Sequence, residues 1–177
     1  MWENTNLMPI DQDAPDLPAP LRDPVALRGV SVAQNRCIGG YFTELFQIIS
    51  TMGMSACSCA ALYYTHPDGR AFGALTHYDG TGESGEMLRV ELNKVGLDNV
   101  EVRHACQVFL AFHPALWSMT AIANLRSLDE HFTSANLRQF KHNGAAGLDN
   151  TGFFFDPYLD PPRAKVKTKK KFHCVIL

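Results

Sequence analysis

Two cysteines and one histidine in the first half of the chain have the types and spacing of a thiol-based active site. Cys57 and Cys59 follow a short polar stretch, and His77 lies further along the chain. An imidazole beside a thiol lowers the thiol pKa, and the thiolate then attacks a carbonyl carbon. We predict that Cys57 is the nucleophile and His77 is its base. Cys59 stays open as an alternative nucleophile, because alternation along a strand places it on the same face as Cys57.

The residues between the thiols and the histidine predict a β-hairpin that brings them together. Residues 60–64 and residues 71–75 are apolar runs typical of buried strands, and residues 66–69, His-Pro-Asp-Gly, are typical of a turn. A hairpin places the start of its first strand beside the end of its second strand. We therefore expect the Cys57 sulfur to lie within hydrogen-bond reach of a His77 ring nitrogen.

The rest of the chain predicts an α+β fold, with a β-sandwich or mixed-sheet core flanked by helices. The periodicity of residues 83–95 indicates an amphipathic helix that Gly96 ends. The other predicted elements are a strand over 24–32, a turn over 36–40, a short helix or an irregular run-in over 41–49, a strand over 100–112, a helix over 118–131 and a last strand over 153–155 after a turn. We divide the chain into a flexible leader (1–22), a catalytic domain (23–160) and a basic tail (161–177).

The remaining histidines and cysteines are predicted to be structural. We expect surface or turn positions for the histidines and core positions for two thiols: His66, His104, His113, His131, His142 and His173, and Cys37 and Cys106. The five cysteines have no framework spacing, and the N-terminus lacks the basic and apolar regions of a secretory signal. These features favour a reduced, intracellular compartment. No apolar run is long enough to predict a transmembrane helix.

Residues 51–77 resemble the active-site region of the cysteine-dependent protein glutamine deamidases, a superfamily that includes the cytotoxic necrotising factors, the Burkholderia lethal factor and the chemoreceptor glutamine deamidases. Residues 54–57, Met-Ser-Ala-Cys, resemble the Leu-Ser-Gly-Cys motif of that family, with an alanine in place of the usual glycine. The family has a threonine six residues before the cysteine, where this chain has Thr51, and a histidine ending the second strand, where it has His77. The resemblance implies a deamidase-like fold.

The resemblance also implies a role for each residue of the motif. The Cys57 thiolate would attack the side-chain amide carbon of a protein glutamine, and His77 would protonate the leaving ammonia and then activate water. Thr51 would orient His77 or contact the substrate. A tight turn at Ser55 and Ala56 would offer backbone donors to the oxyanion. No Cys/His set has the spacing of a zinc site, so we predict no metal and no cofactor.

The end of the sequence combines a basic run with the pattern of a lipid attachment site. Six of the 16 basic residues lie there without any acidic residue: Arg163, Lys165, Lys167, Lys169, Lys170 and Lys171. Ten basic residues then remain against 18 acidic ones, so the rest of the chain has a formal charge of −8 and we predict no nucleic-acid partner. Residues 174–177, Cys-Val-Ile-Leu, have the C-a-a-X pattern, and the final leucine favours geranylgeranyl transfer. We predict that a host geranylgeranyltransferase modifies Cys174 and that the basic residues bind anionic membrane lipids.

The motif and the tail together predict one function, with two alternatives. The prediction is a protein-glutamine deamidase acting on host protein side-chain amides, a bacterial effector that the host prenylates and that is held on the cytoplasmic face of host membranes. A Rho-family small GTPase is the substrate that analogy indicates. The alternatives are another Cys–His thiol hydrolase or protease, and a non-enzymatic, membrane-tethered binding module.

Overall fold

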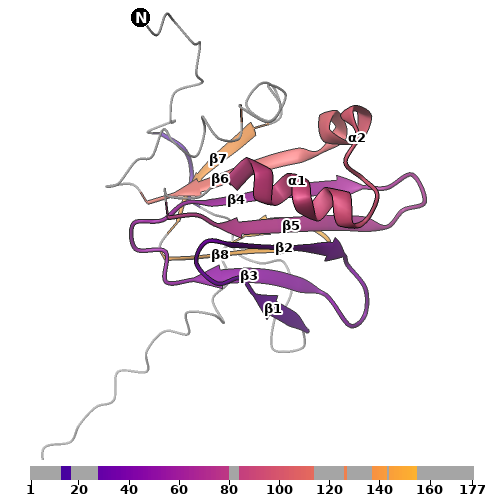
Figure 1. Ribbon diagram of the computed structural model, residues 1–177. Coiled ribbons are helices and arrows are strands. Elements are labelled where there is room, and N and C mark those ends of the chain that lie inside the picture. Colours follow the sequence, from indigo (N-terminus) through magenta and orange to yellow (C-terminus); the bar gives the residue numbers. More distant parts are fainter. Residues whose placement is uncertain are drawn as a thin grey trace, which may run out of the picture.

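Two mixed β-sheets and two helices make up the described part of the protein, which is an α+β fold as predicted (Figure 1). The computed structural model describes residues 13–16, 28–79, 84–113, 126, 137–142 and 144–154. The elements are β1 (Gly29–Ser31), β2 (Arg36–Tyr41), β3 (Ile48–Met52), β4 (Cys59–Thr65), β5 (Ala71–His77), α1 (Ser84–Lys94), α2 (Val100–Ala105), β6 (Gln107–Phe112), β7 (Leu137–Lys141), β8 (Ala145–Asp149) and β9 (Gly152–Phe154). The larger sheet has the order β2-β5-β4-β6-β7, and the smaller sheet has the order β1-β3-β8-β9.

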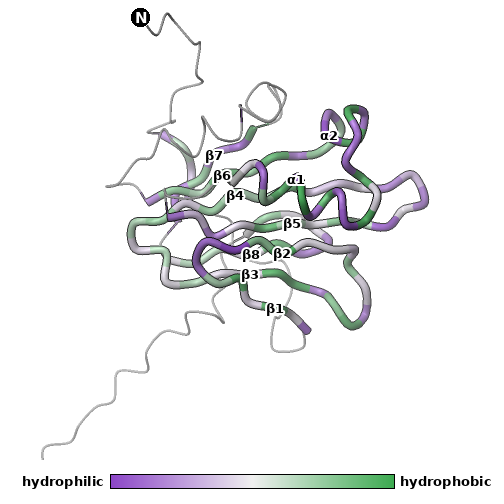
Figure 2. Tube along the Cα trace, viewed as in Figure 1, coloured by the Kyte–Doolittle hydropathy of each residue, from purple (hydrophilic) through white to green (hydrophobic). Residues whose placement is uncertain are grey.

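The predicted hairpin of β4 and β5 is confirmed, and it lies inside the larger sheet with both faces covered. Leu62 and Ala74 belong to a core that the larger sheet shares with α1. Ala61 and Leu75, which are paired across the hairpin, belong to a second core between the two sheets. Because both faces are buried, the strands are continuous apolar runs rather than alternating ones. Figure 2 shows these apolar strands and the polar turn that joins them.

The helix α1 lies across the larger sheet at close range (Figure 1). Leu88 and Leu92 are fully buried beneath it, as the periodicity predicts, and Gly96 follows the helix with a φ of +72°, which favours glycine. A Cβ atom on Gly39 of β2 would lie 2.9 Å from the Cβ atom of Glu91. The turn predicted over residues 36–40 is therefore wrong: these residues form β2, and Gly39 allows the strand and the helix to approach each other.

The strand predicted over residues 100–112 is wrong in its first half. These residues form α2, which is followed by β6. Asn99 caps α2, because its side chain accepts a hydrogen bond from the Val102 N–H at 2.9 Å. The apolar β-branched residues Val100 and Val102 favour a strand, but the cap and the packing of the buried Val102 on the core favour a helix.

The remaining predictions concern residues 41–49, the leader, the last strand, a second helix and the tail. The helical alternative for residues 41–49 is wrong, because these residues end β2, form a loop and begin β3. Within the predicted leader, residues 13–16 pack against the larger sheet, where the backbone of Asp16 forms an isolated parallel β-bridge with Lys141. The last strand is confirmed as β9, and β7 and β8 are additional strands. The predicted helix over 118–131, apart from Arg126, and the basic tail lie outside the described residues. Neither described helix has the length and hydropathy needed to cross a membrane.

Candidate active site

Thr51, Cys57 and His77 lie at the same end of the β-sandwich. Thr51 is near the end of β3 in the smaller sheet, and His77 is the last residue of β5 in the larger sheet. Cys57 belongs to the loop that joins β3 to β4 (Figure 1). The next residue, Ser58, exchanges two backbone hydrogen bonds with Tyr78, at 2.7 and 2.8 Å. This exchange holds Cys57 beside the end of β5.

A buried hydrogen bond joins the two sheets and fixes the tautomer of His77. The Thr51 Oγ1 atom lies 2.8 Å from the carbonyl oxygen of Val32 and 2.8 Å from His77 Nδ1. A carbonyl oxygen can only accept, so the Thr51 hydroxyl donates to Val32 and accepts from the His77 Nδ1–H. Neutral His77 is therefore the Nδ1–H tautomer, and its Nε2 atom carries a lone pair.

The Nε2 atom of His77 has no hydrogen-bond partner among the described residues. The residue is 3% exposed. Burial lowers the pKa of the imidazole, and the Asp79 carboxylate opposes that shift. Buried polar atoms normally have partners, so a buried nitrogen without one calls for an explanation. His77 is therefore a neutral imidazole with a buried Nε2 lone pair that no described residue uses.

The two candidate thiols differ in their access to this base. Cys59 is 0% exposed within β4, and burial raises its pKa well above the ordinary value. Cys57 is partly exposed and lies against the core between the sheets, the same core that contains Leu75 two residues before His77. No hydrogen bond joins the Cys57 sulfur to His77 Nε2 in this structure, since Nε2 has no partner. Of these two thiols, only Cys57 belongs to a residue that is accessible to solvent.

Asp79 adds a negative charge beside the thiol and the imidazole, and no sequence motif singles it out. Its carboxylate accepts hydrogen bonds from Asn35 Nδ2 at 2.7 Å and Gln34 Nε2 at 3.0 Å. Burial and then the Asp79 carboxylate raise the pKa of the Cys57 thiol. The pair is therefore a neutral thiol and a neutral imidazole at neutral pH. The carboxylate favours the imidazolium that forms when His77 takes the thiol proton.

The loop before Cys57 presents backbone N–H groups next to the thiol. The chain turns at Gly53, whose φ of +74° favours glycine, and the exposed Ser55 donates its N–H to the Gly53 carbonyl at 2.9 Å. Within the described part of the chain, the N–H groups of Ala56 and Cys57 donate to no backbone carbonyl. A hydrogen bond from the Ala56 backbone to the thiol lowers the pKa of Cys57. The Cys57 N–H therefore lies beside the nucleophile without an acceptor among the described backbone carbonyls, and such a donor is what an oxyanion requires.

His142 is part of this end of the molecule, so the prediction of a surface or turn position is wrong for it. The residue follows β7 and is 4% exposed. Its Nε2 atom lies 2.8 Å from the carbonyl oxygen of Cys57, and its Nδ1 atom accepts from the Gly144 N–H at 3.1 Å. No local pattern identifies His142, because its contact with the Cys57 loop depends on the pairing of distant strands.

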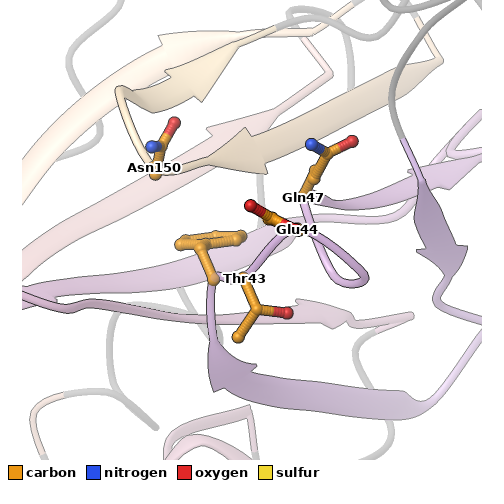
Figure 3. A pocket seen from close by; sticks show the side chains of 5 residues that line it. Thr43, Glu44, Gln47 and Asn150 are labelled. Carbon is orange, nitrogen blue, oxygen red and sulfur yellow. The ribbon is translucent and has the colours of Figure 1, made fainter.

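Two pockets lie outside this group of residues. The pocket in Figure 3 has a volume of about 210 Å³ and lies beside the start of β3, at the opposite end of that strand from Thr51; it is lined by Phe42, Thr43, Glu44, Gln47 and Asn150. A second pocket, of about 330 Å³, lies between β2 and α1 and includes Cys37 and Glu91. Among the described residues, no group of three or more His, Cys, Asp or Glu side chains could hold a metal ion.

Comparison of the chain with models of protein families and with curated proteins finds no match. The geometry of the site consists of a partly exposed thiol, a buried base of fixed tautomer and a backbone N–H at Cys57 that donates to no described carbonyl.

Proposed function

We propose that the chain is a cysteine-dependent protein glutamine deamidase with a deamidase-like fold, in which Cys57 is the nucleophile, His77 is the base and Thr51 orients the base. One observation carries the proposal. Thr51 holds His77 as the Nδ1–H tautomer, and the unpartnered Nε2 lies at the same end of the sandwich as the partly exposed Cys57. The resemblance of residues 51–77 to the deamidase motif indicates which reaction this pair performs.

In the first half of the reaction, the thiol is converted to a thioester. The Cys57 S–H gives its proton to His77 Nε2, and the thiolate attacks the side-chain amide carbon of the glutamine. The carbonyl electrons move to oxygen, and the N–H groups of Ala56 and Cys57 stabilise the oxyanion. His77 Nε2–H then protonates the amide nitrogen, the C–N bond breaks and ammonia leaves. A neutral imidazole is required at the start, and the buried state of His77 favours it.

In the second half of the reaction, water replaces ammonia. His77 Nε2 takes a proton from water, and the hydroxide attacks the thioester carbon. The C–S bond breaks, and the Cys57 sulfur regains the proton from His77. The net change converts a glutamine side chain and water into a glutamate side chain and ammonium, and it balances without a redox step.

The experiment looks for this conversion in proteins of a eukaryotic cell. The purified protein is incubated with a whole-cell extract that includes membranes, and mass spectrometry identifies glutamines converted to glutamate. Cys57→Ser is the inactive variant. Cys37→Ser is the matched control, because Cys37 is also a partly exposed thiol but packs on the core beneath α1.

The outcomes separate the deamidase from its alternatives. Conversion that requires Cys57 and does not require Cys37 supports the proposal. New chain ends with the same dependence on Cys57 would instead identify a protease. The absence of any Cys57-dependent change would leave a binding module as the better description.

We further propose that the tail anchors this enzyme beside a membrane-bound substrate, for which a Rho-family small GTPase is the candidate. The support is the sequence of residues 161–177, in which Cys174 has the prenylation pattern behind six basic residues. One lipid chain alone gives only marginal binding, and the basic residues supply the second signal. Wild type and Cys174→Ser are fractionated from eukaryotic cells with and without a geranylgeranyltransferase inhibitor. Equal membrane association in all four samples would refute the anchor without affecting the assignment of Cys57.

A further inference from the structure

The peptide group that follows Cys57 is held at both of its ends. Its carbonyl oxygen accepts a hydrogen bond from His142 Nε2 at 2.8 Å. Its N–H belongs to Ser58 and donates to the Tyr78 carbonyl at 2.7 Å. Rotation of this peptide would break both hydrogen bonds, so the backbone directly after the nucleophile has one favoured orientation.

His142 connects this peptide to a second loop, and its contacts fix its tautomer. The Gly144 N–H can only donate, so His142 Nδ1 carries a lone pair, and the Cys57 carbonyl can only accept, so Nε2 carries the hydrogen. The Gly144 carbonyl accepts from the Met54 N–H at 3.0 Å. The loop that carries Cys57 is therefore bound to the loop after β7 at Met54 and at Cys57.

We propose that His142 is a positioning residue for the deamidation reaction. It keeps the Cys57 loop in the conformation that presents the Ala56 and Cys57 N–H groups to the oxyanion, and it loosens the attachment of this loop when it gains a proton. The catalytic consequence rests on the proposed function, whereas the control of the Cys57 loop does not. The two side-chain hydrogen bonds of His142 go to backbone atoms. It therefore acts through the loop and does not act on the substrate.

Protonation of His142 would break its link to Gly144, because Nδ1–H would then face the Gly144 N–H and two donors would meet. The titratable groups that face His142 are Cys57 in its loop, His113 after β6 and His77 at the end of β5. The ring centroids of His113 and His142 lie 6.0 Å apart. Burial lowers the pKa of His142, the Cys57 carbonyl opposes this shift, and charges on His113 and His77 add to it. At neutral pH His142 therefore binds both loops, whereas in acid it keeps its bond to Cys57 but loses its bond to Gly144, and the attachment of the Cys57 loop weakens.

The test measures how fast a pyridyl disulfide reagent modifies each cysteine, from about pH 7.5 to about pH 5.5, a range that spans the ordinary histidine pKa. His142→Gln keeps a donor for the Cys57 carbonyl but cannot titrate, and His142→Leu removes the donor. His66→Gln is the matched control, since His66 lies in the turn at the other end of β5. Modification of the fully buried Cys106 reports global unfolding separately from release of the loop.

We expect His142→Leu to raise the modification rate of Cys57 about tenfold at neutral pH, the size of effect that one lost hydrogen bond produces. Cys106 should stay protected. As the pH falls, the Cys57 modification rate of the wild type, divided by that of His142→Gln, should rise. The Cys57 modification rate of His66→Gln should equal that of the wild type at each pH. Equal Cys57 rates in wild type and His142→Leu, or equal pH dependence in wild type and His142→Gln, would overturn the proposal. If His142→Leu unfolds, Cys106 will report it, and the comparison with His142→Gln then decides.

Kinetic measurements on a converted glutamine distinguish the positioning role of His142 from the proposed deamidase activity. His142→Leu should lower kcat about tenfold with little change in KM, and His142→Gln should restore most of kcat at neutral pH. If no glutamine is converted by the wild type but the modification rates follow the expected pattern, the deamidase assignment fails and the control of the loop stands. If glutamines are converted while His142→Leu retains wild-type kcat and wild-type modification rates, the positioning role alone fails.

Discussion

The two ends of β5 carry the same short pattern in opposite surroundings. Residues 66–68, His-Pro-Asp, precede the strand, and residues 77–79, His-Tyr-Asp, end it. At the first end, Asp68 lies 2.9 Å from the ring nitrogen of His66 and 2.7 Å from the guanidinium of Arg70, and its side chain is 43% exposed. At the second end, His77 is 3% exposed and donates to Thr51 across the sandwich.

The difference between these ends shows that burial and a partner from another sheet give the histidine its chemistry. The hydrogen bond from Arg70 holds the pKa of Asp68 below its usual range. The Asp68 carboxylate is therefore charged and pairs with the solvent-exposed guanidinium of Arg70. His77 has one nitrogen fixed by Thr51 and one left without a partner. A histidine and an aspartate at this spacing are thus a surface turn in one place and a candidate active site in the other.

The largest expected effect comes from removing the thiol or the base. Cys57→Ser and His77→Ala should each lower the rate of glutamine conversion by about 10² or more, because each removes a group that makes or breaks a bond. Mass spectrometry of a converted glutamine measures the rate. His66→Ala, at the other end of β5, should keep the wild-type rate, and Cys59→Ser should have a mild effect. Full activity in Cys57→Ser with none in Cys59→Ser would show that the wrong thiol has been assigned.

The next effect tests the contact that distinguishes the two ends. Thr51→Val leaves the His77 Nδ1–H and the Val32 carbonyl without their partner, and each such loss costs about 1–3 kcal/mol in stability. We expect a lower free energy of unfolding in urea and a fall in kcat of about tenfold, because the tautomer of His77 is no longer fixed. Thr51→Ser keeps the hydroxyl and should restore both quantities. If Thr51→Val retains wild-type kcat, the hydroxyl does not orient the base.

Stability in acid should depend on the buried histidines. The folded-state pKa values of His77 and His142 lie below the ordinary value. Below about pH 6.5 the unfolded chain therefore binds protons that the folded chain does not, and stability falls as the pH falls; each unit of pKa shift corresponds to about 1.4 kcal/mol. Urea unfolding at two pH values measures this slope. His77→Gln should flatten this slope, so a slope that His77→Gln leaves unchanged would contradict the expectation.

A smaller effect should come from Asp79. Asp79→Asn removes the charge that raises the pKa of Cys57, so the thiol should ionise at a lower pH. It also removes the charge that favours the imidazolium of His77, so kcat should fall by about two- to fivefold. The pH dependence of Cys57 alkylation by iodoacetamide measures the thiol. A midpoint that stays in place or moves to higher pH would show that Asp79 does not act on the thiol through its charge.

The smallest effect should follow the matching change at the other end. Asp68→Asn removes a solvent-exposed ion pair with Arg70, and such pairs contribute little to stability. We expect the urea midpoint and the Cys57 alkylation profile to match those of the wild type. A clear change in the alkylation profile would mean that the two ends of β5 are coupled through the strand.

Sequence reasoning succeeds where a signal is local and fails where it depends on distant pairing. The hairpin and α1 are predicted because apolar runs, a turn and a helical period lie within a few residues of each other. The helix α2 is missed because its two β-branched residues, Val100 and Val102, favour a strand. The Asn99 side chain caps the helix, and this signal has no apolar pattern. The strand β2 is missed because Gly39 serves packing against Glu91 in a helix far along the chain.

The candidate site follows the same division. The order Thr51, Cys57, His77 is visible in the sequence, and the structure brings Thr51 and His77 into contact. The catalytic role of Cys57 stays a prediction, because no hydrogen bond joins its sulfur to His77 Nε2. The role of His142 is not predicted, since it binds the backbone carbonyl of Cys57. Every residue has such a carbonyl, so residue types do not identify this contact.

Thr51 lies in β3, and β3 is hydrogen-bonded to β8, with Thr51 opposite Ala146. Pairing of segments so far apart in a chain is slow, whereas the β4–β5 hairpin is local. During synthesis the hairpin therefore leaves the ribosome long before the strand that completes its neighbour sheet. We expect pulsed hydrogen exchange to find protection in β4 and β5 before protection in β3 and β8. In a chain still being made, His77 would then lack the Thr51 hydrogen bond that fixes its tautomer in the folded protein.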